Sequence, residues 1–226
     1  PRSLHVIYIL ITMLHYNTIN EILHQSLLHL IEAEVFKDFR LVGGTALSLQ
    51  IGHRISVDID LFSDAQYGTI DFDAITDYLQ QHFKYVDFLS VPPALGRSYI
   101  IGTDMDNAIK LDVFYTDPFI TSPLVEDGIR MARIEEIIAM KIDVVQRGGR
   151  KKDFWDLHAM LKDYTLDQML QLHERRYPYT HEKETILQNF VMFQNADDDF
   201  DPICLKDKYW EFIKDDLKAL IENYKK

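Results

Sequence analysis

The run VDIDLF at residues 57–62 constrains the fold of this chain more than any other segment. Apolar and acidic residues alternate in it, which is the side-chain period of a β-strand and places Asp58 and Asp60 on one face, about 6–7 Å apart. Val57, Ile59 and Leu61 are then expected to point into the core. Like charges on one strand face repel each other. The pair therefore indicates either a solvated face or a site that uses two carboxylates.

A glycine pair interrupts the apolar stretch LVGGTALSL at residues 41–49. Because ordering glycine costs backbone entropy, the pair indicates either a tight turn or a place where something approaches the backbone closely. Gly43 and Gly44 would let backbone N–H groups approach an anion, and a helix predicted from Thr45 to Ile51 would point its positive end there. The Thr45 hydroxyl is a further candidate phosphate ligand.

A third acid occurs in the predicted strand IKLDVFY at residues 109–115. The apolar residues at alternate positions face one way and Asp112 faces the other, so Asp112 could join Asp58 and Asp60 from another strand. Convergent carboxylates on rigid strands suit Mg²⁺, which takes hard oxygen ligands and is completed by water and phosphate. We therefore expect a magnesium–phosphate site at these three acids.

Lys141 lies in the middle of an apolar stripe. The spacing of isoleucines and valines over residues 134–147 predicts an amphipathic helix whose buried face has Lys141 at its centre. A lysine in that position must either extend its amine to solvent or meet an anion. We expect that anion to be a nucleoside triphosphate.

The next predicted helix carries two aspartates near its start. Phe154, Leu157 and Leu161 belong to its apolar stripe. Asp153 lies at the edge of this stripe, whereas Asp156 points away from it. We therefore expect Asp153 in the site and Asp156 in a surface ion pair.

Basic residues gather between these two helices, around Gly148-Gly149: Arg147, Arg150, Lys151 and Lys152. They predict either a solvated loop or a loop that contacts phosphate or RNA at the rim of the site. Arg54 presents a similar choice, because it would either neutralise a phosphate or pair with a carboxylate.

The order of the predicted elements indicates an α+β fold. Thr18 and Glu21 form a capping box that predicts a helix over about 18–36, and a helix over 71–83 and strands over 85–91, 98–102 and 108–115 follow. From residue 122 onward the pattern is helical. We expect a mixed β-sheet core with flanking helices over 13–121 and a helical region over 122–226 that completes the site. Residues 1–12 are expected to be an upstream or non-native extension, or else an additional N-terminal element.

Composition narrows the possible partners. The 226 residues carry a formal net charge of -12, so any polyanion must be met by a local basic patch. The single cysteine, Cys204, excludes an intrachain disulfide and fits a reducing cytoplasm. The apolar run at residues 1–12 is too short to span a bilayer. We expect a cytoplasmic protein with no membrane partner.

The order of these motifs resembles that of nucleotidyltransferases with the DNA polymerase β-type palm. From Met13 onward the chain resembles one branch in particular, the AbiEii/AbiGii toxin family, most densely at LVGGTALSLQIGHRISVDIDLF and again at MKIDVVQRGGRKKDFWDLHAML. The resemblance implies that the glycine turn and the acid pair, here Gly43, Gly44, Asp58 and Asp60, form the metal–triphosphate site. It implies that Lys141 and Asp153 are also needed. Thr45 departs from the serine that the wider superfamily has after its glycine.

These patterns together predict a nucleotidyltransferase with two Mg²⁺ ions and a nucleoside triphosphate as co-substrate. The three carboxylates would hold the metals, and Gly44, Thr45 and Lys141 would hold the β and γ phosphates. The resemblance implies the toxin of a toxin–antitoxin or abortive-infection system, with an antitoxin protein as partner and RNA, such as a tRNA 3′ end, as acceptor. Two alternatives stay open: transfer to an antibiotic-like small molecule or a protein, and a non-catalytic nucleotide-binding module.

Overall fold

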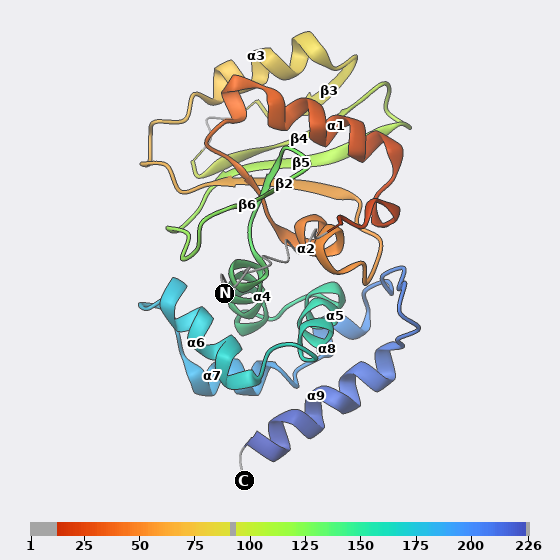
Figure 1. Ribbon diagram of the computed structural model, residues 1–226, viewed down its shortest axis with the longest axis vertical. Helices are drawn as coiled ribbons and strands as arrows, with labels where there is room; N and C mark the ends of the chain where they lie inside the picture. The colour runs from red at the N-terminus through yellow and green to blue at the C-terminus, as the bar shows by residue number, and fades with distance from the viewer. Residues whose placement is uncertain (1–12, 91–93, 225–226) are drawn as a thin grey trace, which may run out of the picture.

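A computed structural model describes residues 13–90 and 94–224 (Figure 1). Within these residues the strands form one mixed sheet of seven, in the order β3-β4-β5-β2-β1-β7-β6. The strands are β1 (Arg40–Leu41), β2 (Asp58–Ser63), β3 (Tyr85–Phe88), β4 (Gly96–Gly102), β5 (Ala108–Tyr115), β6 (Leu124–Glu126) and β7 (Ile129–Met131). The α+β prediction is confirmed.

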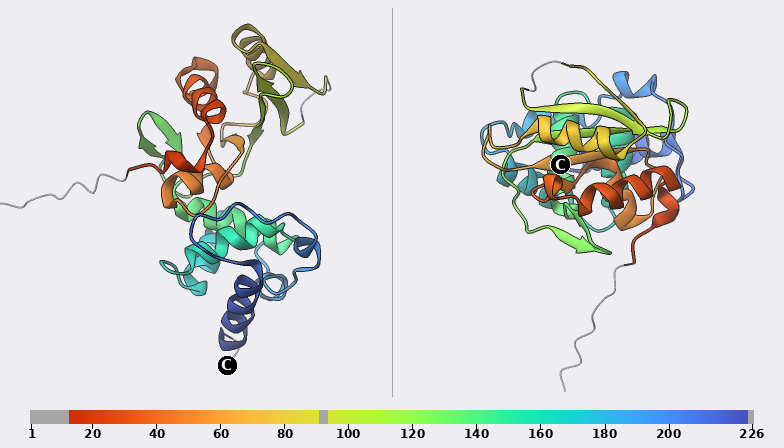
Figure 2. Two further views of the ribbon diagram at one scale, coloured as in Figure 1. Left: turned by 90° about the vertical axis from the view of Figure 1, so that its right-hand side faces the viewer. Right: turned by 90° about the horizontal axis from the view of Figure 1, so that it is seen from above.

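Helices cover the two faces of the sheet differently (Figures 1 and 2). On one face lie α1 (Glu21–Glu32) and α3 (Phe72–His82), and on the other lie α2 (Gly43–Ile51) and α4 (Ile134–Gln146). The helical half is completed by α5 (Lys151–Met160), α6 (Leu166–Arg176), α7 (Lys183–Asn189), α8 (Gln194–Asp197) and α9 (Trp210–Tyr224). Two 3₁₀ turns, η1 (Tyr16–Thr18) and η2 (Glu34–Phe36), flank α1.

The pairing of β2 with β5 determines which side chains share a face. The two strands run parallel, and Asp60 lies opposite Asp112 in their register. Ile59 and Leu61 are fully buried and belong to the face on which α1 packs against β2 and β5. The aspartates consequently point to the opposite face, toward the helical half. Val57 lies just before β2 and is 57% exposed, so its predicted place in the core is wrong.

The first helix begins later than the sequence pattern predicts. Its N-cap is Asn20, whose side chain accepts a hydrogen bond from the Leu23 amide at 2.8 Å. Thr18 lies in η1 instead, where its hydroxyl donates to the His15 carbonyl. The predicted capping box at Thr18 is therefore wrong, and α1 ends at Glu32 rather than near residue 36.

The sheet extends beyond residue 122, where only helix was predicted. β6 and β7 form an antiparallel hairpin, and β7 pairs parallel with β1 through Leu41 and Met131. The hairpin turns at Asp127 and Gly128, both of which have positive φ. The predicted all-helical character of residues 122–226 is therefore wrong for its first ten residues. The expectation for residues 1–12 lies outside the described residues.

In the described part of the chain, no helix combines the length and the apolar character that crossing a membrane requires.

Candidate active site

Three carboxylates meet on the face of the sheet that looks toward the helical half. Asp58 and Asp60 stand at alternate positions of β2, and Asp112 stands beside Asp60 on β5. Lys110 donates to Asp112 at 2.5 Å, and Lys152 of α5 lies 3.6 Å from Asp58. Ammonium groups thus partly offset the charge of the cluster. Because Lys152 belongs to α5 and Asp58 to β2, their contact places the cluster between the helical half and the sheet.

The glycine pair is packed directly against this cluster. Gly43 has φ +68° and opens α2, and a Cβ there would collide with the Asp60 carboxylate. A Cβ at Gly44 would collide with the Arg54 guanidinium. Glycine is therefore needed at both positions for close approach, and at Gly43 also for its left-handed conformation. No side chain caps the first turn of α2, so its N–H groups are available to an anion.

Thr45 holds the turn to the acid strand. Its hydroxyl is fully buried, donates to the Asp58 backbone carbonyl and lies 2.8 Å from the Ser56 hydroxyl. In this arrangement the hydroxyl is engaged within the protein. The contact fixes α2 relative to β2 instead.

A buried ion network lies behind the glycine turn, centred on Asp156. Arg54 binds both Asp156 oxygens, at 2.6 and 2.9 Å, and His53 lies 2.7 Å from one of them. Lys141 lies 2.7 Å from Asp156 and donates to Asp153 at 2.6 Å. Asp156 is fully buried and Lys141 is 6% exposed. This network joins α4, α5 and the segment that leads into β2.

Three sequence-based interpretations change as a result. Asp156 is the centre of a buried network and not a surface residue, because α5 is buried on nearly every side and has no free polar face. Arg54 pairs with a carboxylate, which is the second of the two options given above. Lys141 does meet anions, but they are carboxylates of its own chain. Asp153 also caps α5, since it accepts from the Arg150 amide at 3.0 Å.

The electrostatics of the network favour its ionised form. Burial disfavours the charge on Asp156, but Arg54 and Lys141 outweigh it and hold the pKa of Asp156 well below its ordinary value. Burial likewise opposes the charge on Lys141, yet Asp156 and Asp153 raise its pKa. The pKa of His53 is lowered, first by burial. His53 is therefore neutral near pH 7 and serves the network as a hydrogen-bond partner.

Most of the basic residues between α4 and α5 are already paired. Arg147 contacts Asp143, Arg150 lies 3.2 Å from Asp199, and the Lys151 amine lies 2.8 Å from Asp201. Lys151 is buried and lies 5.5 Å from the centre of the Trp210 ring. Lys151 and Lys152 belong to α5 rather than to a loop. The prediction of one basic loop is thus wrong in part, and Lys152 is the member that reaches the acid cluster.

This pairing predicts different effects for two adjacent lysines. Lys151→Gln should lower the free energy of unfolding by about 1–3 kcal/mol, because it leaves polar groups around a buried amine without their partner. Lys152→Gln should change it by less than about 0.5 kcal/mol, as is usual at partly exposed positions. Urea denaturation of both variants measures this difference. Equal stabilities would contradict the assigned burial of Lys151.

The acid cluster has the chemistry of a divalent-metal site. Burial, then the charges of Asp112 and Asp58, raise the pKa of Asp60 to about 6. The Oδ1 atom of Asp112 is buried and, among the described residues, has no hydrogen-bond partner. Crowded carboxylates and an unpartnered oxygen fit a hard cation. As the side chains stand in residues 13–90 and 94–224, no group of three or more His, Cys, Asp or Glu is placed to hold a metal ion, so the three carboxylates would have to move together and substrate or water would have to supply further ligands.

The raised pKa of Asp60 makes stability depend on pH. Between about pH 4 and pH 6 Asp60 is protonated more in the folded protein than in the unfolded chain, so its contribution to stability falls as the pH rises through this range. The rise in the pKa of Asp60 from 3.8 to about 6 corresponds to roughly 3 kcal/mol of folding free energy over the whole titration. In metal-free buffer the stability of the wild type relative to Asp60→Asn should therefore fall by about 2 kcal/mol from pH 4.5 to pH 7.5, because part of the full effect lies below pH 4.5. Thermal melts at both pH values test this, and a constant difference would contradict it.

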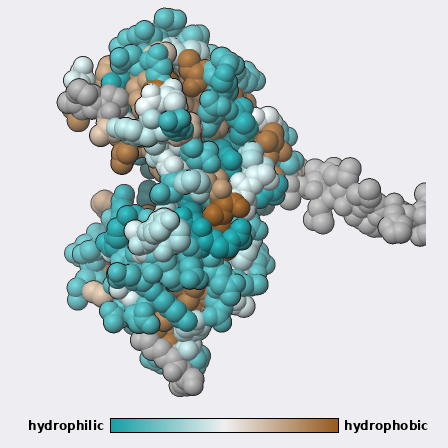
Figure 3. Space-filling view, turned by 90° about the vertical axis from the view of Figure 1, so that its left-hand side faces the viewer, coloured by the Kyte–Doolittle hydropathy of each residue, from teal (hydrophilic) through white to brown (hydrophobic). Residues whose placement is uncertain are grey.

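A cavity of about 270 Å³ opens beside the acid cluster. Asp58, Arg150, Lys152 and Phe200 line it, and Phe200 is 98% exposed. Figure 3 shows the molecule hollowed between the upper half, which carries the sheet, and the lower helical half. The cavity thus offers carboxylates, cations and a free aromatic ring to a bound molecule.

The chain is similar to known proteins over most of its length. The family model described as nucleotidyl transferase AbiEii toxin, type IV TA system, matches residues 25–224. The chain is 27% identical over 206 residues to an uncharacterised protein of Aquifex aeolicus (strain VF5), covering 88% of this chain and 94% of that protein. Its fold is similar to a proposed nucleotidyltransferase from H. pylori, with a TM-score of 0.57, 20% identity and coverage of 88% and 92%. A second Helicobacter pylori structure matches with a TM-score of 0.52, 18% identity and coverage of 88% and 89%.

Proposed function

Because the chain belongs to the AbiEii family of nucleotidyltransferase toxins, we propose that it transfers a nucleoside monophosphate from a nucleoside triphosphate to an acceptor hydroxyl at the acid cluster of β2 and β5. The observation that carries this proposal is the register that sets Asp60 beside Asp112, with Gly43 packed against the Asp60 carboxylate. The metal end and the phosphate end of the reaction would then lie next to each other.

Asp58, Asp60 and Asp112 would hold the divalent metal, which we propose to be two Mg²⁺ ions. When bound, Mg²⁺ supplies positive charge that stabilises the oxygens around the reacting phosphorus. The unpartnered Oδ1 of Asp112 could also accept the proton of the attacking hydroxyl. Lys110 and Lys152 offset carboxylate charge near neutral pH, and their amines would have to shift as the site fills.

The triphosphate would lie at the first turn of α2. There Gly43 and Gly44 expose uncapped backbone N–H groups at the positive end of the helix. Thr45, Arg54, Lys141 and Asp153 would act mainly as positioning residues, because the structure engages their polar atoms in contacts that hold the turn, β2 and α5 together. The Lys141 ammonium has three N–H groups, of which Asp153 and Asp156 engage two. The third could donate a hydrogen bond to a phosphate oxygen.

We propose RNA, with a tRNA 3′ end as the first candidate, as the acceptor. The cavity beside Asp58 supports this, because Phe200 offers a ring for base stacking while Lys152, 3.6 Å from Asp58, offers charge to phosphates. The family also implies an antitoxin partner. One observation favours a small-molecule or protein acceptor as the alternative. Little positive charge is free near the site, because acids pair with Arg147, Arg150 and Lys151.

The acceptor can be identified directly. The wild-type protein is incubated with total RNA and each α-³²P-labelled nucleoside triphosphate in Mg²⁺, and the products are separated before and after treatment with ribonuclease and with protease. Label in an RNA band that ribonuclease removes supports the proposal. Label that survives ribonuclease but not protease, or label on a small molecule, contradicts RNA as the acceptor while leaving the acid cluster as the transfer site.

A further inference from the structure

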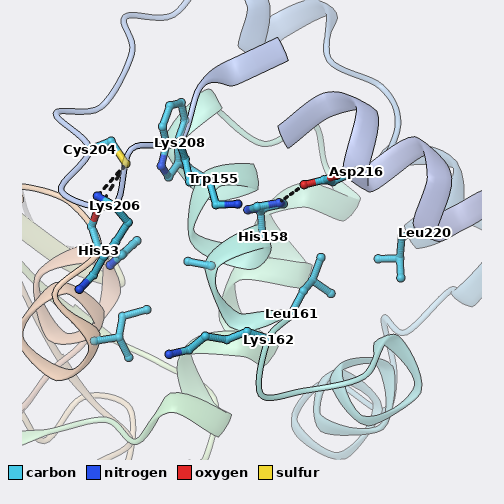
Figure 4. Close-up of a pocket in the computed structure, with 12 residues that line it drawn as sticks. His53, Trp155, His158, Leu161, Lys162, Cys204, Lys206, Lys208, Asp216 and Leu220 are labelled. Atoms are coloured by element: carbon cyan, nitrogen blue, oxygen red, sulfur yellow. Dashed lines mark hydrogen bonds and ion pairs between the residues drawn. The ribbon is translucent and has the colours of Figure 1, made fainter. Parts of the chain in front are cut away.

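A second cavity lies along the C-terminal part of α5, whereas the cavity beside Asp58 lies at the start of that helix (Figure 4). Its volume of about 570 Å³ is in the range of small-molecule sites. It is formed by the end of α2, by α5, by α9 and by the segment 204–208 between α8 and α9. No residue that lines it also lines the cavity beside Asp58. His53, which bonds to Asp156 in the ion network, lines the second cavity, and its neighbour Arg54 lines the first, so the network lies between the two.

The walls of this second cavity are mainly apolar. They include the indole of Trp155, which is 3% exposed to solvent, and five other residues with apolar surface: Ile51, Ala159, Leu161, Cys204 and Leu220. Trp155 and the ring of Trp210 stack behind this wall, with 6.4 Å between ring centroids. Apolar walls of this kind suit a ligand with an aromatic or aliphatic body.

Three lysines surround the same cavity. Lys206 and Lys208 come from the segment before α9, and Lys162 comes from the turn after α5 (Figure 4). Neither Lys206 nor Lys208 is within ion-pair distance of a carboxylate in the described part of the chain, whereas Lys162 has only Asp163 at 3.5 Å. The acid in the lining, Asp216, is already bonded to His158 at 2.8 Å. The lining thus holds three lysines and one aspartate, which is a positive excess in a chain of net charge -12, although the exposed Asp207 lies between Lys206 and Lys208 in the sequence.

We propose that this cavity binds an amphipathic anion: a small molecule with an apolar aromatic or aliphatic body and a single carboxylate, sulfonate or phosphate. The body would pack on Trp155, Leu161 and Leu220, and the head group would lie between Lys206 and Lys208. The cavity has α5 on one side and α9 with its preceding segment on the other. A small molecule fits between these walls, whereas the flat surface of a partner protein does not.

Fluorescence titration with 8-anilinonaphthalene-1-sulfonate, an aromatic anion, tests the proposal on the intact protein. One molecule should bind per chain, and decanoate or 2-naphthoate should displace it, whereas the uncharged decanol and 2-naphthol should displace it at least tenfold less well. Displacement by decanoate assigns the site to aliphatic acids, and displacement by 2-naphthoate alone assigns it to aromatic acids. Equal displacement by the uncharged pair would overturn the proposal.

Variants locate the binding. Lys206→Gln combined with Lys208→Gln should weaken binding about tenfold, and Ala159→Phe should abolish it by filling the cavity. Lys84→Gln, at an exposed lysine beside β3, is the matched control and should bind like wild type. The double lysine variant keeps the proposal testable if Ala159→Phe does not fold, as judged by circular dichroism. Unchanged affinity in the folded double variant would overturn it.

Discussion

Asp60→Asn should reduce nucleotidyl transfer by about 10³-fold or more, since groups that act as one catalytic unit fail together. The same change should stabilise the metal-free protein near pH 7.5. Asp60 is crowded by Asp112 and Asp58, and the Gly43 backbone lies against it, so its charge opposes folding in the absence of a cation. For a chain of this size we expect a rise in Tm of roughly 4–8 °C.

The matched control is Asp87→Asn, which removes an exposed carboxylate from β3 in the same sheet. It should change neither transfer nor Tm. Label transfer and differential scanning calorimetry on the three proteins measure both effects. An Asp60→Asn protein that is as active as wild type, or that melts well below it, would show that this carboxylate serves the fold and not the reaction.

Asp156→Asn should be the most destabilising change at the site. It removes the charge that faces Arg54, Lys141 and His53 in a fully buried position. Removing one partner of a buried ion network leaves uncompensated charges and costs about 3–5 kcal/mol. Lys141→Met should be destabilising for the same reason, because Asp153 and Asp156 both lose a cation.

Asp163→Asn is the control for this second prediction. Asp163 follows α5, its side chain is 60% exposed, and its partner Lys162 is 71% exposed, so its loss should cost less than about 1 kcal/mol. Urea denaturation gives the free energy of unfolding of each variant. If Asp156→Asn unfolds within 1 kcal/mol of wild type, the network does not hold the two halves of the site together.

The acid cluster could be predicted because its signals are local. The period-two alternation in 58–61 and 109–113 identifies which side chains share a face, and the parallel register of β2 and β5 brings those faces together. The glycine turn could also be predicted from a local signal, the adjacent pair Gly43-Gly44. The structure gives the reason for Gly43, since a Cβ there would collide with the Asp60 carboxylate. The bounds of β5 agree with prediction for the same reason.

The ion network could not be predicted, because it depends on packing between distant segments. A helical wheel places Asp156 opposite the apolar stripe, but α5 is enclosed by α4, α8 and α9 and by the segment that carries Arg54. The residue pattern of a single helix cannot predict that its polar face will be buried by other segments of the chain. The β6–β7 hairpin differs, since Asp127-Gly128 between two short apolar runs is a turn signal that was available in the sequence.

The most direct test of the account is metal-dependent transfer by the acid cluster itself. Single-turnover transfer of α-³²P-labelled nucleotide to total RNA or to endogenous acceptor is followed with Mg²⁺ or with EDTA, for wild type and for Asp112→Asn. We expect label to transfer only in the wild type with Mg²⁺, and Asp112→Asn to retain a wild-type melting curve or a higher one. Transfer in EDTA, or by Asp112→Asn at the wild-type rate, would contradict the assignment of the site to β2 and β5.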